Sequence, residues 1–98
     1  MWPTRIRRRI TPVADTLVGL DSVWLFGSAT RIENPHDIDL LAVYDRDIIA
    51  PSEVHLLGDA LNEALVDNEL GICIILLHRR EHLSSRFSAE EDAIQVWP

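Results

Sequence analysis

The sequence predicts an α+β fold, a small mixed β-sheet with helices packed on one face. Its length of 98 residues leaves room for one domain, which we take as residues 1–98. Four short apolar runs have the composition of strands, and apolar residues recur at helical spacing in the segments between them. Because no more than one helix separates consecutive strands, a mixed sheet covered by these helices is the expected arrangement.

The first predicted helix occupies residues 4–20 and has two different faces. One face is apolar, and its residues are Ile6, Ile10, Val13, Ala14 and Leu17. Pro12 either kinks this helix or opens a second one capped by Thr11. The other face forms a solvated surface or contacts RNA, phosphate or an acidic partner, and its basic residues are Arg5, Arg7, Arg8 and Arg9.

The rest of the chain alternates between strands and helices. We predict strands at residues 23–26, 37–44, 72–77 and 93–97, helices at 52–68 and 79–87, and one helical turn at 29–32. Gly71 restarts the chain after the longer of these helices. The predicted order is therefore helix, strand, strand, helix, strand, short helix, strand.

Composition narrows the function classes. The formal net charge is −7, which argues against an extensive nucleic-acid-binding surface. All nine basic residues are arginine, so the chain has neither a Schiff-base lysine nor the lysine of a P-loop. It has no apolar run of roughly 20 residues and no signal-peptide pattern, so we expect no membrane partner and a cytoplasmic location. Cys73 is the only cysteine, which excludes an internal disulfide.

Two adjacent motifs indicate a nucleotide bound with a divalent metal. Gly27-Ser28 ends the apolar strand at residues 23–26, and a glycine there lets the backbone come close to a phosphate. Asp37 and Asp39 begin the next strand at i, i+2, so both point to the same face. Carboxylate oxygens are ligands that Mg²⁺ prefers. A Gly-Ser pair or a D-x-D pair alone is common, whereas the combination is far more specific.

With these motifs the chain resembles the DNA polymerase β-type nucleotidyltransferase superfamily, and more closely its minimal nucleotidyltransferase (MNT) branch. The matching residues read FGSATR at Phe26–Arg31 and DIDLL at Asp37–Leu41. The resemblance implies a mixed sheet and Mg²⁺-dependent, two-metal transfer of a nucleoside monophosphate from a nucleotide such as ATP. The order of elements agrees along nearly the whole chain, although the specific motif covers only residues 25–43.

The resemblance also implies roles for five residues. Gly27 and Ser28 correspond to the phosphate-binding turn of the family. Asp37 and Asp39 correspond to the first two carboxylates, which bind the metal and act in catalysis. Arg31 lies where the motif often carries an arginine near the nucleotide.

The sequence departs from the family at two points. The eight residues Ala29–His36 separate the two motifs, which is fewer than in many members. The third carboxylate of the family usually lies on the strand after the long helix, and here Cys73 takes that place. A thiol is a poor ligand for Mg²⁺ and a poor base for a hydroxyl group. Asp67 or Glu69 could substitute if the strand begins differently, so the question of enzymatic activity stays open.

The resemblance implies an antitoxin that transfers AMP from ATP to a hydroxyl group of a HEPN-type toxin. The alternative, favoured by Cys73, is a catalytically degenerate module that acts by binding its partner. A third interpretation is a transferase that acts on a small molecule or an RNA end. Because the chain ends where the minimal fold ends, we expect a partner protein or self-association to supply the surface that recognises the acceptor.

Overall fold

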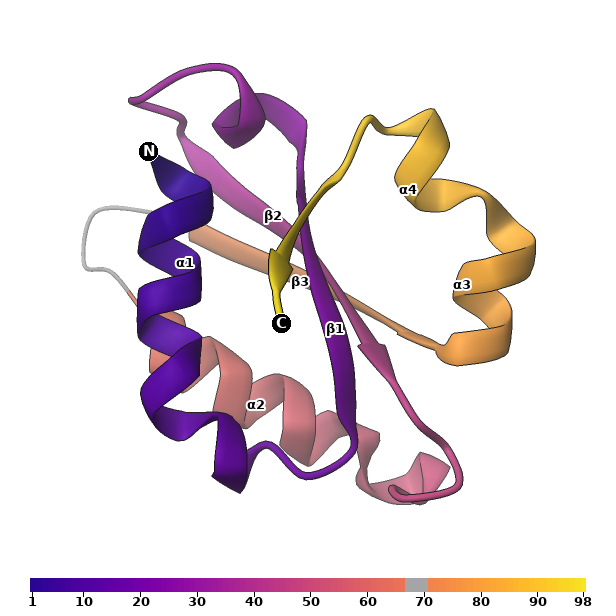
Figure 1. The fold of residues 1–98 in the computed structure, drawn as a ribbon. Coiled ribbons are helices and arrows are strands. Elements are labelled where there is room, and N and C mark those ends of the chain that lie inside the picture. Colours follow the sequence, from indigo (N-terminus) through magenta and orange to yellow (C-terminus); the bar gives the residue numbers. More distant parts are fainter. Residues whose placement is uncertain (67–70) are drawn as a thin grey trace.

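The computed structural model describes residues 1–66 and 71–98 (Figure 1). Its strands are β1 (Leu20–Phe26), β2 (Asp37–Tyr44), β3 (Gly71–His78) and β4 (Ile94–Trp97). Its α-helices are α1 (Trp2–Ile10), α2 (Val54–Leu65), α3 (Arg79–Ser85) and α4 (Phe87–Glu90). Short 3-10 turns are η1 (Thr11–Thr16), η2 (Gly27–Thr30) and η3 (Pro51–Glu53). The order of strands and helices is the predicted one, except that two short helices, α3 and α4, replace the single helix predicted at residues 79–87.

The strands form a mixed sheet in the order β3-β2-β1-β4. β1 runs antiparallel to both β2 and β4, whereas β2 and β3 are parallel. The parallel connection runs through α2, as it must, because a tight turn cannot join parallel strands. β2 and β3 keep one register from Asp37↔Gly71 to Tyr44↔His78. The predicted fold class, a small mixed sheet with helices, is confirmed.

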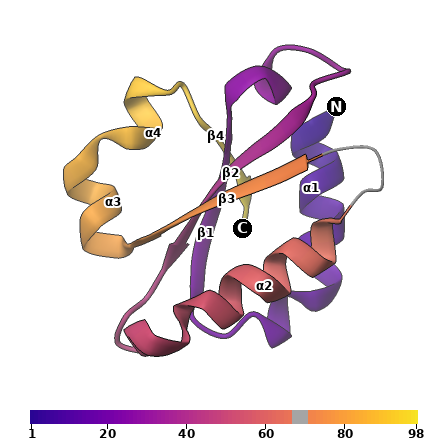
Figure 2. The ribbon, with the colours of Figure 1, turned by 180° about the vertical axis from the view of Figure 1, so that it is seen from behind.

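The two long helices, α1 and α2, lie against one face of the sheet (Figures 1 and 2). Side chains alternate along a strand, so β2 sends every second residue to this face. The resulting core joins both helices to the central strands, and its fully buried members include Ile10, Val23, Leu25, Leu40 and Leu61. Burying one such side chain contributes about 1.5–3 kcal/mol.

The short helices α3 and α4 lie against the opposite face, which the sequence did not predict. Trp24 and Phe26 point to that face because they alternate along β1 with Val23 and Leu25, which face the core. The His82 ring lies 5.3 Å from the Trp24 ring, and the Phe87 ring meets the Phe26 ring edge-on at 5.0 Å. Part of the second face is therefore covered too.

Several element boundaries differ from the sequence prediction; β1, for example, begins at Leu20 and not at residue 23. α1 ends at Ile10 and continues as the 3-10 turn η1, so Pro12 interrupts the helix without opening a second α-helix. Thr11 donates its hydroxyl to the Arg7 carbonyl at 2.8 Å and caps no N-terminus. α2 ends at Leu65 because Val66 is already extended.

Candidate functional site

The two aspartates lie at the start of β2, on the face opposite α1 and α2. Ile38 and Leu40 are buried in the core, so Asp37 and Asp39 alternate to the other face. Asp37 is exposed and Asp39 is half-buried. The two carboxylates therefore stand side by side at one end of the sheet, accessible to a ligand.

Gly27 brings the turn η2 against Asp39. Phe26 pairs with Asp39 across β1 and β2, so the next residue begins η2 directly beside that carboxylate. A methyl group at Gly27 would lie 2.5 Å from Asp39 Oδ2, and the Gly27 φ angle is +77°. Both the close approach and the left-handed backbone require glycine here. The structure thus joins the two sequence motifs.

Gly71 makes the matching contact with Asp37. It is the register partner of Asp37 on β3, and a methyl group there would lie 2.5 Å from Asp37 Oδ1. The carboxylate lies over the glycine because no side chain blocks it. Sequence reasoning missed this role and treated Gly71 as a restart of the chain. A glycine that opens the strand beside a D-x-D strand is the signal that could have revealed it.

The turn η2 is held by its own hydrogen bonds. The Ser28 carbonyl accepts the N–H groups of Arg31 and Ile32, both at 2.9 Å. Thr30 donates its hydroxyl to the Gly27 carbonyl at 2.7 Å. The Ser28 side chain is half-buried, and Arg31 is exposed. These bonds give the turn a defined conformation beside Asp39.

A hollow of about 420 Å³ opens beside the turn. Gly27, Thr30 and Arg31 line one side of it. The other side comes from the end of α4 and the turn that follows it, where Glu90, Glu91 and Asp92 are exposed. The sequence analysis predicted no role for these three acidic residues, because they follow the Gly27-Ser28 motif by about sixty positions. The positive charge that Arg31 brings to the hollow therefore faces an acidic rim.

Cys73 lies beside Asp39 on the neighbouring strand. The two are register partners in the parallel pair, so their side chains share a face of the sheet. The thiol is exposed. The strand position next to the two carboxylates thus carries a sulfur atom. Asp67 and Glu69, the other candidates for a third carboxylate, lie outside the described residues.

The donor set suits a magnesium ion that keeps other ligands. Asp37 and Asp39 offer hard carboxylate oxygens on one accessible face. Mg²⁺ is often bound by one or two carboxylates, with water and substrate phosphates completing the octahedron. Within residues 1–66 and 71–98, no group of three or more His, Cys, Asp or Glu is placed to hold a metal ion. The residues present fit an ion brought by a nucleotide better than a metal held by protein alone.

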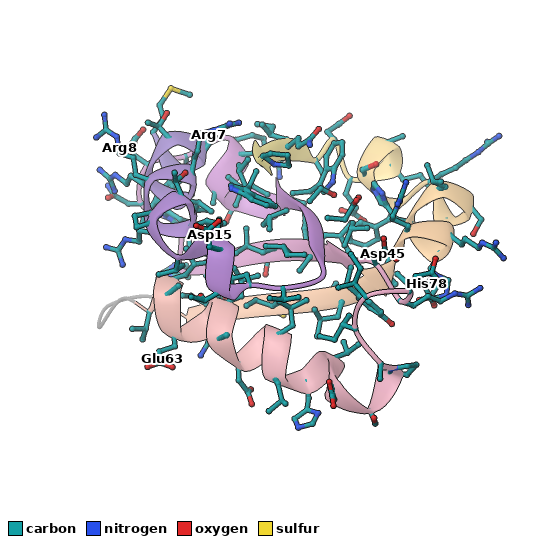
Figure 3. All side chains as sticks on the ribbon, turned by 60° about the horizontal axis from the view of Figure 1, so that its bottom comes forward. Arg7, Arg8, Asp15, Asp45, Glu63 and His78 are labelled. Atoms are coloured by element: carbon teal, nitrogen blue, oxygen red, sulfur yellow. The ribbon has the colours of Figure 1, made fainter. Side chains whose placement is uncertain are left out.

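The arginines of α1 lie away from this carboxylate pair. Arg5 stacks over the Trp2 ring at 4.8 Å, and Arg9 donates to the Val66 carbonyl at 3.0 Å. Arg7 and Arg8 are exposed, and Figure 3 shows Arg8 on the outer side of the helix. Contacts within the fold therefore account for Arg5 and Arg9, whereas the other two arginines extend into solvent.

The mixed sheet and its helices form a nucleotidyltransferase-like α+β fold. Among solved structures, the chain is similar to that of a putative nucleotidyltransferase from Sulfolobus solfataricus, with a TM-score of 0.58. The two share 17% identity, and the match covers 94% of this chain and 77% of that chain. No protein-family model matches the chain, and no curated protein matches it significantly.

Among the described helices, none combines the length and the apolar character needed to span a lipid bilayer.

Proposed function

We propose that this protein is a nucleotidyltransferase of the MNT type that transfers AMP from ATP to a hydroxyl group of a partner protein. The observation that supports this most is the seating of two carboxylates against two glycines. Asp39 contacts Gly27 of the turn, and Asp37 lies over Gly71. The arrangement leaves both carboxylates open to a nucleotide and its metal.

Each site residue has a chemical task in this proposal. Asp37 and Asp39 would hold Mg²⁺, which neutralises charge on the phosphates when bound. The Gly27 backbone and the Ser28 hydroxyl would donate hydrogen bonds to phosphate oxygens. Arg31 would contact the nucleotide from the hollow beside the turn. The protein's contribution is mainly positioning and electrostatic stabilisation, which is what phosphoryl transfer requires.

The proposed reaction forms one bond and breaks one at phosphorus, and the acceptor hydroxyl loses its proton. The acceptor oxygen bonds to the α-phosphorus of ATP, the bond from that phosphorus to the bridging oxygen breaks, and pyrophosphate leaves. The hydroxyl proton passes to solvent or to a carboxylate of the pair. A positioned base contributes about 10²–10⁴-fold to such a rate, and Cys73 stands where the family has its third carboxylate. We therefore expect slow transfer.

The partner in this proposal is a HEPN-type toxin, and the protein acts as its antitoxin. This assignment rests on the resemblance of FGSATR and DIDLL to the MNT branch. A second candidate function has a specific observation in its favour. Because the position beside Asp39 carries the Cys73 thiol, the protein could bind nucleotide and neutralise its partner without catalysis.

The proposal is tested by incubating this protein with labelled ATP, Mg²⁺ and the product of the neighbouring gene. We expect label on the partner with the wild type and none with Asp39→Asn. Asp15→Asn, an exposed aspartate of η1, is the matched control and should transfer like the wild type. Absence of label, with ATP binding intact in calorimetry, excludes catalysis and supports the binding module. Absence of both overturns the nucleotide site.

A further inference from the structure

Strand β3 forms an edge of the sheet without the usual protections. Natural edge strands are kept from pairing by charges, prolines, bulges or short length. β3 spans Gly71–His78 and contains no Asp, Glu, Arg, Lys or Pro. Its register with β2 is unbroken along its whole length. The opposite edge strand, β4, has four residues and a register shift, so the two edges are not equivalent.

The apolar side chains of β3 are also incompletely covered. Ile72, Ile74 and Leu76 line a hollow of about 410 Å³ beside α2. Every residue from Ile72 to Leu77 is at least partly exposed, whereas Leu40–Val43 on the adjacent strand β2 are fully buried. Figure 2 shows β3 as the outermost strand on this side, with no described segment beyond it. The edge therefore offers both backbone groups and apolar surface.

The two ends of β3 differ in charge. At its start, the Asp37 carboxylate lies over Gly71 and thus reaches the open edge. At its end, three arginines and two aspartates line a hollow next to His78. Arg79 pairs with Asp45 at 3.5 Å, whereas Arg80 has no ion pair among the described residues. Figure 3 shows Asp45 and His78 together at that end.

The acidic start and basic end of β3 favour a second copy of the same strand as its partner, and they favour antiparallel pairing. When two identical strands pair antiparallel, the end of each lies beside the start of the other. Arg80 of each copy then approaches the Asp37 end of the other copy. Parallel pairing would instead bring like ends together. An antiparallel pair of identical strands is two-fold symmetric and closes as a dimer, and the short, irregular β4 does not extend it further.

We propose that two copies of this chain associate through antiparallel pairing of their β3 strands, so that one sheet runs across the dimer. The contact buries the apolar side chains of both edges and places each candidate site next to the other copy. This inference concerns assembly and does not depend on the proposed transfer reaction. The sequence left self-association as one of two alternatives, and this inference assigns a specific surface to it.

Sedimentation equilibrium over a range of protein concentrations tests the proposal. We expect a dimer for the wild type, and a monomer for Ile75→Lys, with circular dichroism unchanged. Ile74→Lys puts the charge on the other face and should give the same result, which covers the case that one variant fails to fold. Val18→Lys, at a position 63% exposed outside the sheet, is the control and should remain dimeric.

Cys73 offers a second measurement on the otherwise unaltered chain. A two-fold pairing centred on Ile74 puts the two Cys73 Cα atoms about 8 Å apart, and one centred on Ile75 puts them about 14 Å apart, from a strand spacing of about 4.8 Å and a rise of about 3.4 Å per residue. Nitroxide labels on Cys73 should then broaden each other's spectra, and excess unlabelled protein should remove the broadening. A monomer at every concentration, or a dimer that survives both lysine variants without broadening, overturns the proposal.

Discussion

Replacing Gly71 by alanine tests whether the close contact between the Asp37 carboxylate and Gly71 matters for nucleotide binding. The new methyl group would lie 2.5 Å from Asp37 Oδ1, and ordinary contact begins at 3.4 Å, so the carboxylate oxygen must withdraw by about 0.9 Å. Gly71 is not among the glycines with positive φ, so alanine fits the backbone. At a compatible position this replacement usually stabilises a protein by about 0.4–1 kcal/mol through the unfolded chain, and this gain offsets part of the cost of moving Asp37. We therefore expect the free energy of unfolding to change by no more than about 1 kcal/mol.

Nucleotide binding should respond more strongly than stability. Mg²⁺ demands near-ideal geometry at about 2.0–2.1 Å from each oxygen, so a ligand displaced by this distance is largely lost. We expect the affinity for ATP with Mg²⁺ to fall at least about tenfold, equivalent to about 1.4 kcal/mol. Isothermal titration calorimetry, with and without Mg²⁺, measures this effect. The loss should disappear when Mg²⁺ is omitted, because only the metal ligand has moved.

Gly58→Ala is the matched control for this experiment. It makes the same replacement on α2, where the new methyl group would lie 3.0 Å from Leu76 Cδ1 and far from the carboxylates in the fold. Its affinity for ATP should equal that of the wild type. If Gly71→Ala folds, as judged by denaturation, and binds ATP with Mg²⁺ like the wild type, then Asp37 does not bind the metal as proposed.

Three further predictions concern other parts of the molecule. Cys73→Asp supplies the carboxylate beside Asp39, and label transfer from ATP should rise by about 10²-fold or more; an unchanged rate would show that this strand position takes no part in the reaction. Arg31→Gln removes the positive charge that lines the hollow next to Gly27, so ATP affinity measured by calorimetry should fall and become less dependent on salt; equal affinities and salt slopes would exclude that contact. Leu61→Ala removes a fully buried side chain and leaves a cavity in the core. Urea denaturation should therefore show that the free energy of unfolding falls by about 2–5 kcal/mol. A smaller loss would mean that the core collapses around the site.

The sequence predicted the elements well because their patterns are local. Strand β2 begins and ends at the predicted residues 37 and 44, and the order of the other strands and helices agrees apart from the division of the last predicted helix into α3 and α4. Alternation of side chains along β2 was enough to place Asp37 and Asp39 on one face. The roles of Asp37, Asp39, Gly27, Ser28 and Arg31 stay predictions until binding is measured.

Long-range features could not be obtained in the same way. The side of the sheet taken by α3 and α4 depends on contacts of Trp24 and Phe26 with residues about sixty positions away. The acidic rim at residues 90–92 comes next to Gly27 only because the chain returns to the sheet as β4. No local periodicity encodes such a meeting, since it follows from how the elements pack.

The sequence by itself determined that a Gly-Ser turn precedes a pair of carboxylates on one strand face, and that a thiol follows on a later apolar strand. Only the tertiary structure decided that Asp39 lies against Gly27, that Asp37 lies over Gly71, and that β3 is an edge. The physical reason is strand register, because a shift of one residue would turn every side chain to the other face. Register is set by pairing and burial across the whole sheet.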